Sequence, residues 1–294
     1  MEQRDFGKSG LRVSVVGFGA GHIGSPDQSE VDVERLLGAV LDAGCTLIDT
    51  ARGYGMSEER IGRHLKHRRD EFVLSSKCGY GIDGHGDWTA GIIEAGVDEA
   101  LRLLQTDRID IMHLHSCPKD VLERGEVAEA LNRCREKGKI RVAAYSGEND
   151  ALQYAIASGA FGSVQFSVNL CDQRSARNDA PMAKAKGMGV IGKRPIANAF
   201  WRFDDQPHGQ YAEEYWLRAK SMGLRPPDGL DWDEFALRFA AFHDYVDSVI
   251  VGTSKTENFA RNAQIAARGA LSPEIVAGVR HAFSDHDNNW VGQV

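Results

Sequence analysis

Two side chains that could transfer a proton lie close together near the start of the chain. Asp49 closes an apolar run that begins at Thr46, and Tyr54 follows five residues later on a loop that leads into a predicted helix. A phenol is a useful acid near neutral pH only if its surroundings lower its pKa of about 10, so the pair needs partners. Lys77 and His115 each close a later apolar run. These four side chains predict a site of acid–base chemistry.

Alternating strand and helix signals along the chain supply the elements that would position these residues. The predicted strands are 13–18, 46–50, 72–77, 109–115, 141–145, 163–167, 190–193 and 248–252. The predicted helices are 30–43, 57–66, 90–104, 121–137, 151–158, 175–186, 232–243 and 256–267. Each strand has the pattern of a strand buried on both faces, as parallel strands covered by helices are. Eight such units in 294 residues predict one domain, a (β/α)8 TIM barrel, with a doubly wound sheet as the alternative.

Three segments lie outside the eightfold count. Residues 4–12 contain two glycines and predict a hairpin that plugs the bottom of the barrel. Residues 196–230 form a long loop after the seventh strand, and their many aromatic side chains predict an ordered lid. Ser272 and Pro273 predict the start of a last helix, with Ser as N-cap.

Composition excludes several classes of protein. A hydrophobic fraction of 42%, a charged fraction of 26% and a net charge of -7 indicate a soluble protein without a nucleic-acid-binding surface. No apolar run approaches the roughly 18 residues of a membrane helix, and the first residues are too polar for a signal peptide. The five cysteines include no C-x-x-C pair, which indicates reduced thiols and a cytoplasmic location. The oligomeric state has no signal in the sequence.

The carboxyl ends of the strands carry most of the polar residues that the barrel would present to a ligand. Active sites of such barrels lie at that end. The residues there are Asp49, Lys77, His115, Ser146, Gln165, Lys193 and the run Gly252-Thr253-Ser254-Lys255. Asp49, Lys77 and His115 end three consecutive strands, and Tyr54 follows the first of them. We therefore expect these four side chains to converge.

These residues resemble the pattern of the aldo-keto reductase family. The matching pieces, in the family's order, are Asp49-Thr-Ala-x-x-Tyr54-Gly, Ser57-Glu58, Lys77, Asp110 with His115, Tyr145-Ser146, Val164-Gln165 and Gly252-Thr253-Ser254-Lys255. Residues 6–13 and 17–19 also look like the family's usual start. The resemblance covers nearly the whole chain, and so many pieces in register are specific.

The resemblance implies an oxidoreductase that reduces an aldehyde or ketone with NADP(H), with NAD(H) as the alternative cofactor. Tyr54 would protonate the carbonyl oxygen as hydride arrives from nicotinamide, and the charge of Lys77 would make the phenol more acidic. Asp49 would pair with Lys77 and hold it. His115 would hydrogen-bond the same oxygen and orient the substrate. No metal has a part in this chemistry.

The resemblance also implies where the cofactor would bind. Ser146 and Gln165 would hold the nicotinamide carboxamide, and the amides around Gly252, Thr253 and Ser254 would bind phosphate at a helix start. The other implied contacts are Lys193 and Arg194, which stand where many members have a stacking aromatic residue, and Lys255, Asn258 and Asn262 near the adenosine phosphate. His22, Tyr80, Trp88 and Trp201 would line the substrate pocket.

Other interpretations start from different motifs. Gly19-Ala-Gly21-His-Ile-Gly24 fits the G-x-G-x-x-G pattern of a Rossmann dinucleotide site, but Pro26 should prevent a helix from opening there. His113-x-His115 could bind zinc in a metal-dependent barrel hydrolase, although the next two strands end in Ser and Gln. A redox-sensing or regulatory barrel that binds cofactor with little turnover is a further alternative. Taken singly, each of these residues could also have no catalytic role. Asp49 could be a helix cap, Lys77 a solvated strand end and Tyr54 a surface aromatic residue.

Overall fold

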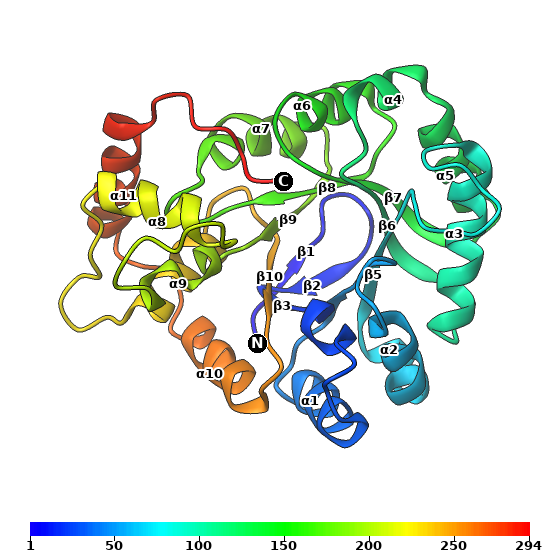
Figure 1. Ribbon diagram of the computed structural model, residues 1–294, viewed down its shortest axis with the longest axis horizontal. Helices are drawn as coiled ribbons and strands as arrows, with labels where there is room; N and C mark the ends of the chain where they lie inside the picture. The colour runs from blue at the N-terminus through cyan, green and yellow to red at the C-terminus, as the bar shows by residue number, and fades with distance from the viewer.

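Eight parallel strands close into a barrel in the computed structural model, which describes residues 1–294 (Figure 1). The strands are β3 (Val16–Gly19), β4 (Leu47–Asp49), β5 (Val73–Cys78), β6 (Ile109–His115), β7 (Ile140–Ser146), β8 (Ser163–Ser167), β9 (Gly189–Lys193) and β10 (Ser248–Gly252). They follow one another around the ring, and β10 pairs with β3 to close it. The predicted (β/α)8 barrel is confirmed, and the doubly wound alternative is wrong.

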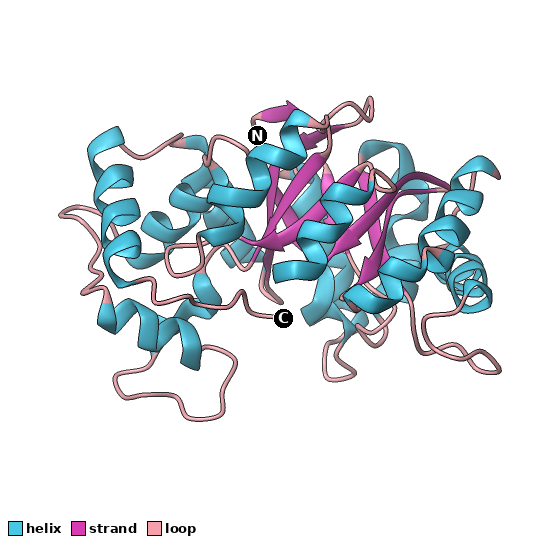
Figure 2. Ribbon diagram, turned by 90° about the horizontal axis from the view of Figure 1, so that it is seen from above, coloured by secondary structure: helices cyan, strands magenta, loops and turns pink.

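Helices surround the strands of the barrel (Figure 2). They are α1 (Glu30–Asp42), α2 (Ser57–Leu65), α3 (Ala90–Leu103), α4 (Lys119–Arg124), α5 (Glu126–Glu136), α6 (Asn149–Ser158), α7 (Arg174–Ala185), α8 (Glu213–Ser221), α9 (Trp232–Ala241), α10 (Thr256–Ala267) and α11 (Pro273–His286), with short 3₁₀ helices η1 (Ala20–Gly24), η2 (Lys66–Glu71) and η3 (Ala197–Arg202). A cluster of 57 buried residues fills the space between strands and helices. The packing of this core holds the strands, and with them the residues at their ends, in position.

Local sequence explains where several helices begin. The side chains of Ser29, Thr89, Asp231 and Ser272 each accept a hydrogen bond from an amide in the first turn of the following helix. Such caps satisfy one of the amides that a helix start leaves without a partner. The start predicted at Ser272-Pro273 is confirmed.

Two predicted elements are each divided in the structure. The helix expected over 121–137 is wrong as one element, because Gly125 has φ +81° and separates α4 from α5. The strand expected over 13–18 is also wrong as one element. Ser14 Oγ donates to the carbonyl of Val16 at 2.7 Å, a local bond that turns the chain between β2 (Arg12–Ser14) and β3.

The N-terminal hairpin closes one end of the barrel. β1 (Gln3–Asp5) pairs antiparallel with β2, and Phe6, Leu11 and Val13 are buried against side chains of the barrel interior. The backbone at Gly7 has φ +53°, and a Cβ there would lie 2.5 Å from the backbone of Gly187 and Gly189. Figure 2 shows the hairpin and the C-terminus at opposite ends of the barrel. The predicted plug is confirmed.

The long segment after β9 is folded. It contains η3 and α8, and its aromatic side chains pack with α9 and α11 in a second buried cluster. The chain after α11 returns over the barrel, where Gln293 and Val291 accept hydrogen bonds from Arg194 and Arg218. The predicted ordered loop and this C-terminal segment together border the carboxyl ends of the strands.

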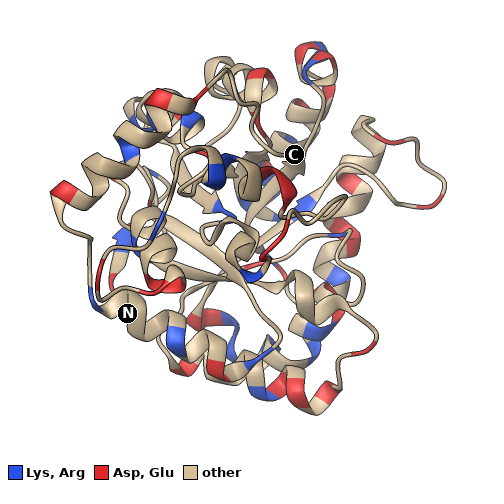
Figure 3. Ribbon diagram, turned by 60° about the vertical axis from the view of Figure 1, so that its left-hand side comes forward, with Lys and Arg blue, Asp and Glu red and all other residues tan.

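Charges of both signs occur along the outer helices (Figure 3). None of the helices has both the length and the apolar composition needed to cross a lipid bilayer.

Replacing Phe6 tests the plug. Phe6 is fully buried, so Phe6→Ala should lower the free energy of unfolding by about 3–5 kcal/mol through lost burial and the cavity left behind. Urea denaturation followed by circular dichroism measures the change. Val31→Ala removes an apolar side chain that is 64% exposed and should change stability by less than about 0.5 kcal/mol. Equal effects of the two substitutions would show that the hairpin contributes no core.

Candidate active site

A buried ion pair lies at the centre of the site. Asp49 ends β4 and Lys77 lies in the neighbouring β5, so the barrel brings the two side chains together. Lys77 Nζ donates to Asp49 Oδ2 at 2.5 Å and to the carbonyl of Thr50 at 2.8 Å. The side chains are only 2% and 1% exposed. Such a pair needs further hydrogen bonds to offset the loss of hydration.

Two neighbouring side chains supply those hydrogen bonds, and a third contacts one of the two. Ser75 Oγ donates to Asp49 Oδ1 at 2.7 Å, and Gln165 Nε2 donates to the same oxygen at 3.0 Å. His113 Nε2 lies 3.1 Å from Ser75 Oγ. The carboxylate is therefore held by side chains of β5 and β8, and His113 on β6 contacts Ser75 from behind.

The electrostatics of the pair keep both groups ionised. Burial is the largest single effect and would raise the pKa of the Asp49 carboxyl, but the surrounding groups, first among them the charge of Lys77, together outweigh it, and the pKa lies below its ordinary value. Burial is the largest single effect and would lower the pKa of the Lys77 amine, yet Asp49 and Tyr54 together hold it above its ordinary value. The ammonium of Lys77 is consequently held in a fixed position at the bottom of the site.

Tyr54 lies next to this ammonium. Lys77 Nζ is 5.0 Å from the centroid of the Tyr54 ring. The Tyr54 loop is held against the loop after β3, since Met56 N donates to the carbonyl of Gly24 at 3.1 Å. A Cβ on Gly24 would fall 1.7 Å from the Tyr54 carbonyl oxygen, so only glycine permits this approach. The ring is thus placed by backbone contacts as well as by Lys77.

His115 completes the group of four. Its ring meets the Tyr54 ring edge-on, with centroids 5.9 Å apart. Burial, with smaller effects of Lys77 and Lys193, lowers the pKa of His115 to about 3. The imidazole is therefore neutral near pH 7 and carries one ring proton.

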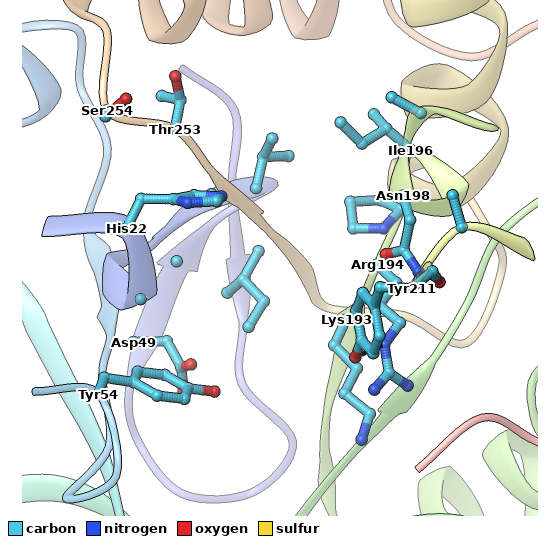
Figure 4. Close-up of a pocket in the computed structure, with 18 of the residues that line it drawn as sticks. His22, Asp49, Tyr54, Lys193, Arg194, Ile196, Asn198, Tyr211, Thr253 and Ser254 are labelled. Carbon is cyan, nitrogen blue, oxygen red and sulfur yellow. Dashed lines mark hydrogen bonds between the residues drawn. The ribbon is translucent and has the colours of Figure 1, made fainter. Parts of the chain in front are cut away.

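These residues line a cavity of about 1100 Å³ at the carboxyl ends of the strands. Nine of its 29 lining residues are hydrophobic. Figure 4 shows Tyr54 on one side of the cavity and Lys193 and Tyr211 on the other. The predicted residues that line it are Asp49, Tyr54, Lys77, His115, Ser146, Gln165, Lys193, Arg194, Gly252, Thr253, Ser254, Lys255, Asn258 and His22.

One flank of the cavity carries groups suited to an anion. Helix α10 begins at Thr256 after Lys255, and no side chain caps the amides of its first turn. A Cβ on Gly252 would lie 3.0 Å from His22 Cδ2, so the glycine leaves room between the strand end and the His22 ring. Lys255 lines the cavity, and no carboxylate lies within ion-pair distance of it. The uncapped amides at the start of α10 and the unpaired ammonium of Lys255 together favour the binding of a phosphate group.

Another part of the cavity wall contains Ser146 and Gln165. Ser146 Oγ donates to Gln165 Oε1 at 2.9 Å, while the amide nitrogen of Gln165 donates to Asp49. Both side chains are buried at the barrel mouth. The pair presents hydroxyl and amide groups in a fixed orientation beside the Asp49–Lys77 pair.

The wall opposite Tyr54 depends on a residue that sequence reasoning missed. Glu148 Oε1 lies 3.3 Å from Lys193 Nζ and accepts hydrogen bonds from the amide and hydroxyl of Ser167 at 2.8 Å. Burial outweighs the attraction of Glu148 and lowers the pKa of Lys193. Glu148 comes two residues after Ser146, and this position just beyond a strand end was the available signal.

Arg194 is engaged on several sides. It donates to Ser167 Oγ at 2.9 Å, to the carbonyl of Gln293 and, through Nε, to Tyr211 Oη at 2.5 Å. Its guanidinium also lies 4.9 Å from the centroid of the Tyr211 ring. Tyr211, likewise missed from the sequence, lies 17 residues further on in the long loop.

Four predicted residues do not line the cavity. Trp201 stacks on Trp232 with centroids 5.4 Å apart, in the aromatic cluster of the long loop. Asn262 is buried on α10. Tyr80 and Trp88 lie behind His115, with Tyr80 Oη 2.6 Å from His115 Nδ1. These four residues are therefore absent from the lining of the cavity.

The Rossmann interpretation is wrong for this fold. The glycine motif ends β3 and forms η1, the next α-helix begins only at Glu30, and the sheet is a closed barrel. For the zinc interpretation, no group of three or more His, Cys, Asp or Glu side chains has an arrangement suited to a metal ion. His113 and His115 instead bond to Ser75 and Tyr80.

Comparisons with known proteins agree with this geometry. The model of the aldo/keto reductase family matches residues 15–282. L-galactose dehydrogenase of Arabidopsis thaliana is 28% identical over 278 residues, which cover 89% of this chain and 87% of that protein. D-threo-aldose 1-dehydrogenase of a Pseudomonas species is 27% identical, with 92% and 93% covered. The holo form of an aldo-keto reductase from Bacillus halodurans has a TM-score of 0.82 at 27% identity, with 96% of each chain covered.

The comparisons therefore place this barrel, with the cavity at its carboxyl end, among the oxidoreductases. The chain belongs to the aldo/keto reductase family.

Buried histidines should make the stability pH-dependent. Burial lowers the pKa of His113 to about 3, whereas a histidine in the unfolded chain titrates near 6.5. Above pH 6.5 the contribution of the buried histidine to stability is fully present. Below pH 6.5 the unfolded state binds a proton that the folded state does not bind, so the free energy of unfolding falls by about 1.4 kcal/mol per pH unit per histidine. Between pH 6.5 and 5, His113→Asn should therefore flatten the slope by about that amount.

Urea denaturation at several pH values measures this slope. His67→Asn changes an exposed histidine and should leave the slope as it is. A slope unaffected by His113→Asn would mean that His113 is protonated in the folded protein.

Proposed function

We propose that this protein is an NADP(H)-dependent carbonyl reductase in which Tyr54 is the general acid. The observation that carries the proposal is the convergence of Tyr54, the ionised Lys77–Asp49 pair and neutral His115 on one cavity. Each of these side chains carries the chemical group that carbonyl reduction requires at its position. The family generally uses NAD(P)H, and its members act on small carbonyl compounds.

In this proposal the four side chains divide the work. Tyr54 gives its proton to the carbonyl oxygen, and the ammonium of Lys77 stabilises the phenolate that remains. Asp49 fixes that ammonium. His115, being neutral, donates its ring proton to the same oxygen, so two donors meet the charge that develops there. In the reverse direction the same groups take a proton from an alcohol.

The cavity fits a dinucleotide cofactor. Ser146 and Gln165 would hold a carboxamide, and the free amides of α10 with Lys255 would hold phosphate. When bound, the nicotinamide supplies or accepts hydride at the carbonyl carbon. The wall formed by Lys193 and Arg194 would border the cofactor where an aromatic side chain is common in the family.

A sugar or another polyol suits the substrate side of the cavity. Only nine of the 29 lining residues are hydrophobic, so most of the wall can form hydrogen bonds. Two relatives are named as dehydrogenases of sugars. We place the protein in the cytoplasm, because all five cysteines are free and buried and would remain reduced there.

Removing the general acid tests the proposal. Tyr54→Phe should bind NADPH as the unaltered protein does, yet turnover of a panel of aldehydes and ketones should fall by roughly 10²- to 10⁴-fold. Nucleotide fluorescence measures binding, and loss of nicotinamide absorbance measures turnover. Tyr154→Phe, on α6 outside the barrel, is the control for loss of a phenol. Full activity of Tyr54→Phe would refute the assigned role, whereas nucleotide binding by the unaltered protein without any turnover would favour a regulatory barrel.

Lys255 should set the preference for NADPH. Its ammonium is free to meet a 2'-phosphate near Asn258, whereas Arg261 is paired with Asp231 at 2.5 Å. Lys255→Met should weaken NADPH binding about tenfold, the size of one charge-assisted hydrogen bond, and leave NADH binding nearly unchanged. Fluorescence titration with each nucleotide measures both. Arg261→Met is the matched control, and an equal loss for both nucleotides would contradict a contact to the 2'-phosphate.

A further inference from the structure

The loop after β5 holds a tyrosine directly against His115. Tyr80 Oη lies 2.6 Å from His115 Nδ1, and the two rings are stacked with centroids 5.6 Å apart and an interplanar angle of 26°. His115 therefore has Tyr80 on one side and the edge of Tyr54 on another. The contact engages Nδ1 and leaves Nε2 without a hydrogen-bond partner in the protein.

Backbone geometry keeps Tyr80 in this position. Trp88 has φ +59°, which is costly for a non-glycine residue, and its amide donates to the carbonyl of Gly79 at 2.9 Å. The Trp88 ring meets the Tyr80 ring edge-on at 6.1 Å. A side chain on Gly79 would fall 2.1 Å from the Trp88 ring. The loop is thus built to pack Trp88 behind Tyr80.

The direction of the Tyr80 hydrogen bond depends on the protonation states of both groups and on which other partners the phenol has. Burial raises the pKa of Tyr80, so the phenol keeps its proton near pH 7. His115 is neutral there and has one proton to place on either nitrogen. Tyr80 Oη has no other hydrogen-bond partner in the structure, so donation to Nδ1 is the arrangement that uses its proton. The imidazole proton then lies on Nε2.

We infer that Tyr80 is a positioning residue that fixes the tautomer of His115, with Nδ1 as acceptor and Nε2–H as the donor that meets the carbonyl oxygen. With the opposite tautomer, Nε2 would present a lone pair to an oxygen that is becoming negative, and this contact would be repulsive. The inference rests on the proposed function for the role of Nε2–H. The tautomer itself is a property of the protein without substrate.

Nitrogen NMR of the histidine-labelled full chain reads the tautomer without any turnover. The His115 signals, assigned by their loss in His115→Asn, should show an unprotonated Nδ1 and a protonated Nε2. Tyr80→Phe keeps the stacked ring and removes only the hydroxyl, so it should give a mixture of the two tautomers. A proton on Nδ1 in the unaltered protein, or an unchanged tautomer in Tyr80→Phe, would overturn the inference.

Kinetics distinguish a positioning role from a merely structural one. Tyr80→Phe should lower kcat about tenfold, as expected for one lost hydrogen bond, while the Kd for NADPH stays within about twofold. Tyr154→Phe should change neither. An unchanged kcat in Tyr80→Phe would contradict the role.

Gly53 offers a second way to disturb the same contact. A Cβ there would lie 3.0 Å from Tyr80 Oη, so Gly53→Ala should displace the hydroxyl and lower kcat in the same direction. In the Tyr80→Phe background the hydroxyl is already gone, and Gly53→Ala should add little. Fully additive losses would count against the inference. If Tyr54→Phe keeps full turnover while the NMR result is as expected, the proposed function fails and the tautomer assignment stands.

Discussion

The buried pair of Lys77 and Asp49 is the interaction on which the site depends. Neither charge would be tolerated alone inside the barrel, because removing one partner of such a pair leaves an uncompensated charge. Their mutual attraction keeps both ionised despite burial. The pair also joins β4 and β5 with β8 through Gln165, so the same contacts that hold the ammonium also hold the strand ends together. Tyr54, His115 and the cavity wall are arranged around that fixed charge.

Much of this arrangement could be predicted from the chain alone. Asp49, Lys77, His115, Ser146 and Gln165 lie at or near the ends of apolar runs, and a barrel of parallel strands brings such ends to one side. The strand order around the ring then makes neighbours of residues far apart in the sequence. The hairpin could also be predicted, because its glycines and alternating residues are local signals.

Other parts depend on packing that local patterns do not encode. By residue type, Trp201 could line a pocket or pack against a core equally well, and only the position of Trp232 shows that it packs against the second cluster. Glu148 follows a strand end like the predicted residues, but its importance comes from Lys193 on another strand. Tyr80 was expected in the substrate pocket, and its 2.6 Å contact with His115 Nδ1 depends on how the loop after β5 packs, which the local sequence does not encode. The break at Gly125 depends on a single left-handed residue.

The seam between β3 and β10 has a consequence for the order of assembly. It pairs the first barrel strand with the last, so the ring closes only after nearly the whole chain is available, and this step has the longest sequence separation of the strand pairings. Gly19 and Gly252 meet across that seam, and both line the cavity. The flank suited to an anion therefore depends on the strand pairing with the largest sequence separation. A ligand seated there would bridge the two ends of the chain and resist their separation, so ligand occupancy and ring closure are thermodynamically linked.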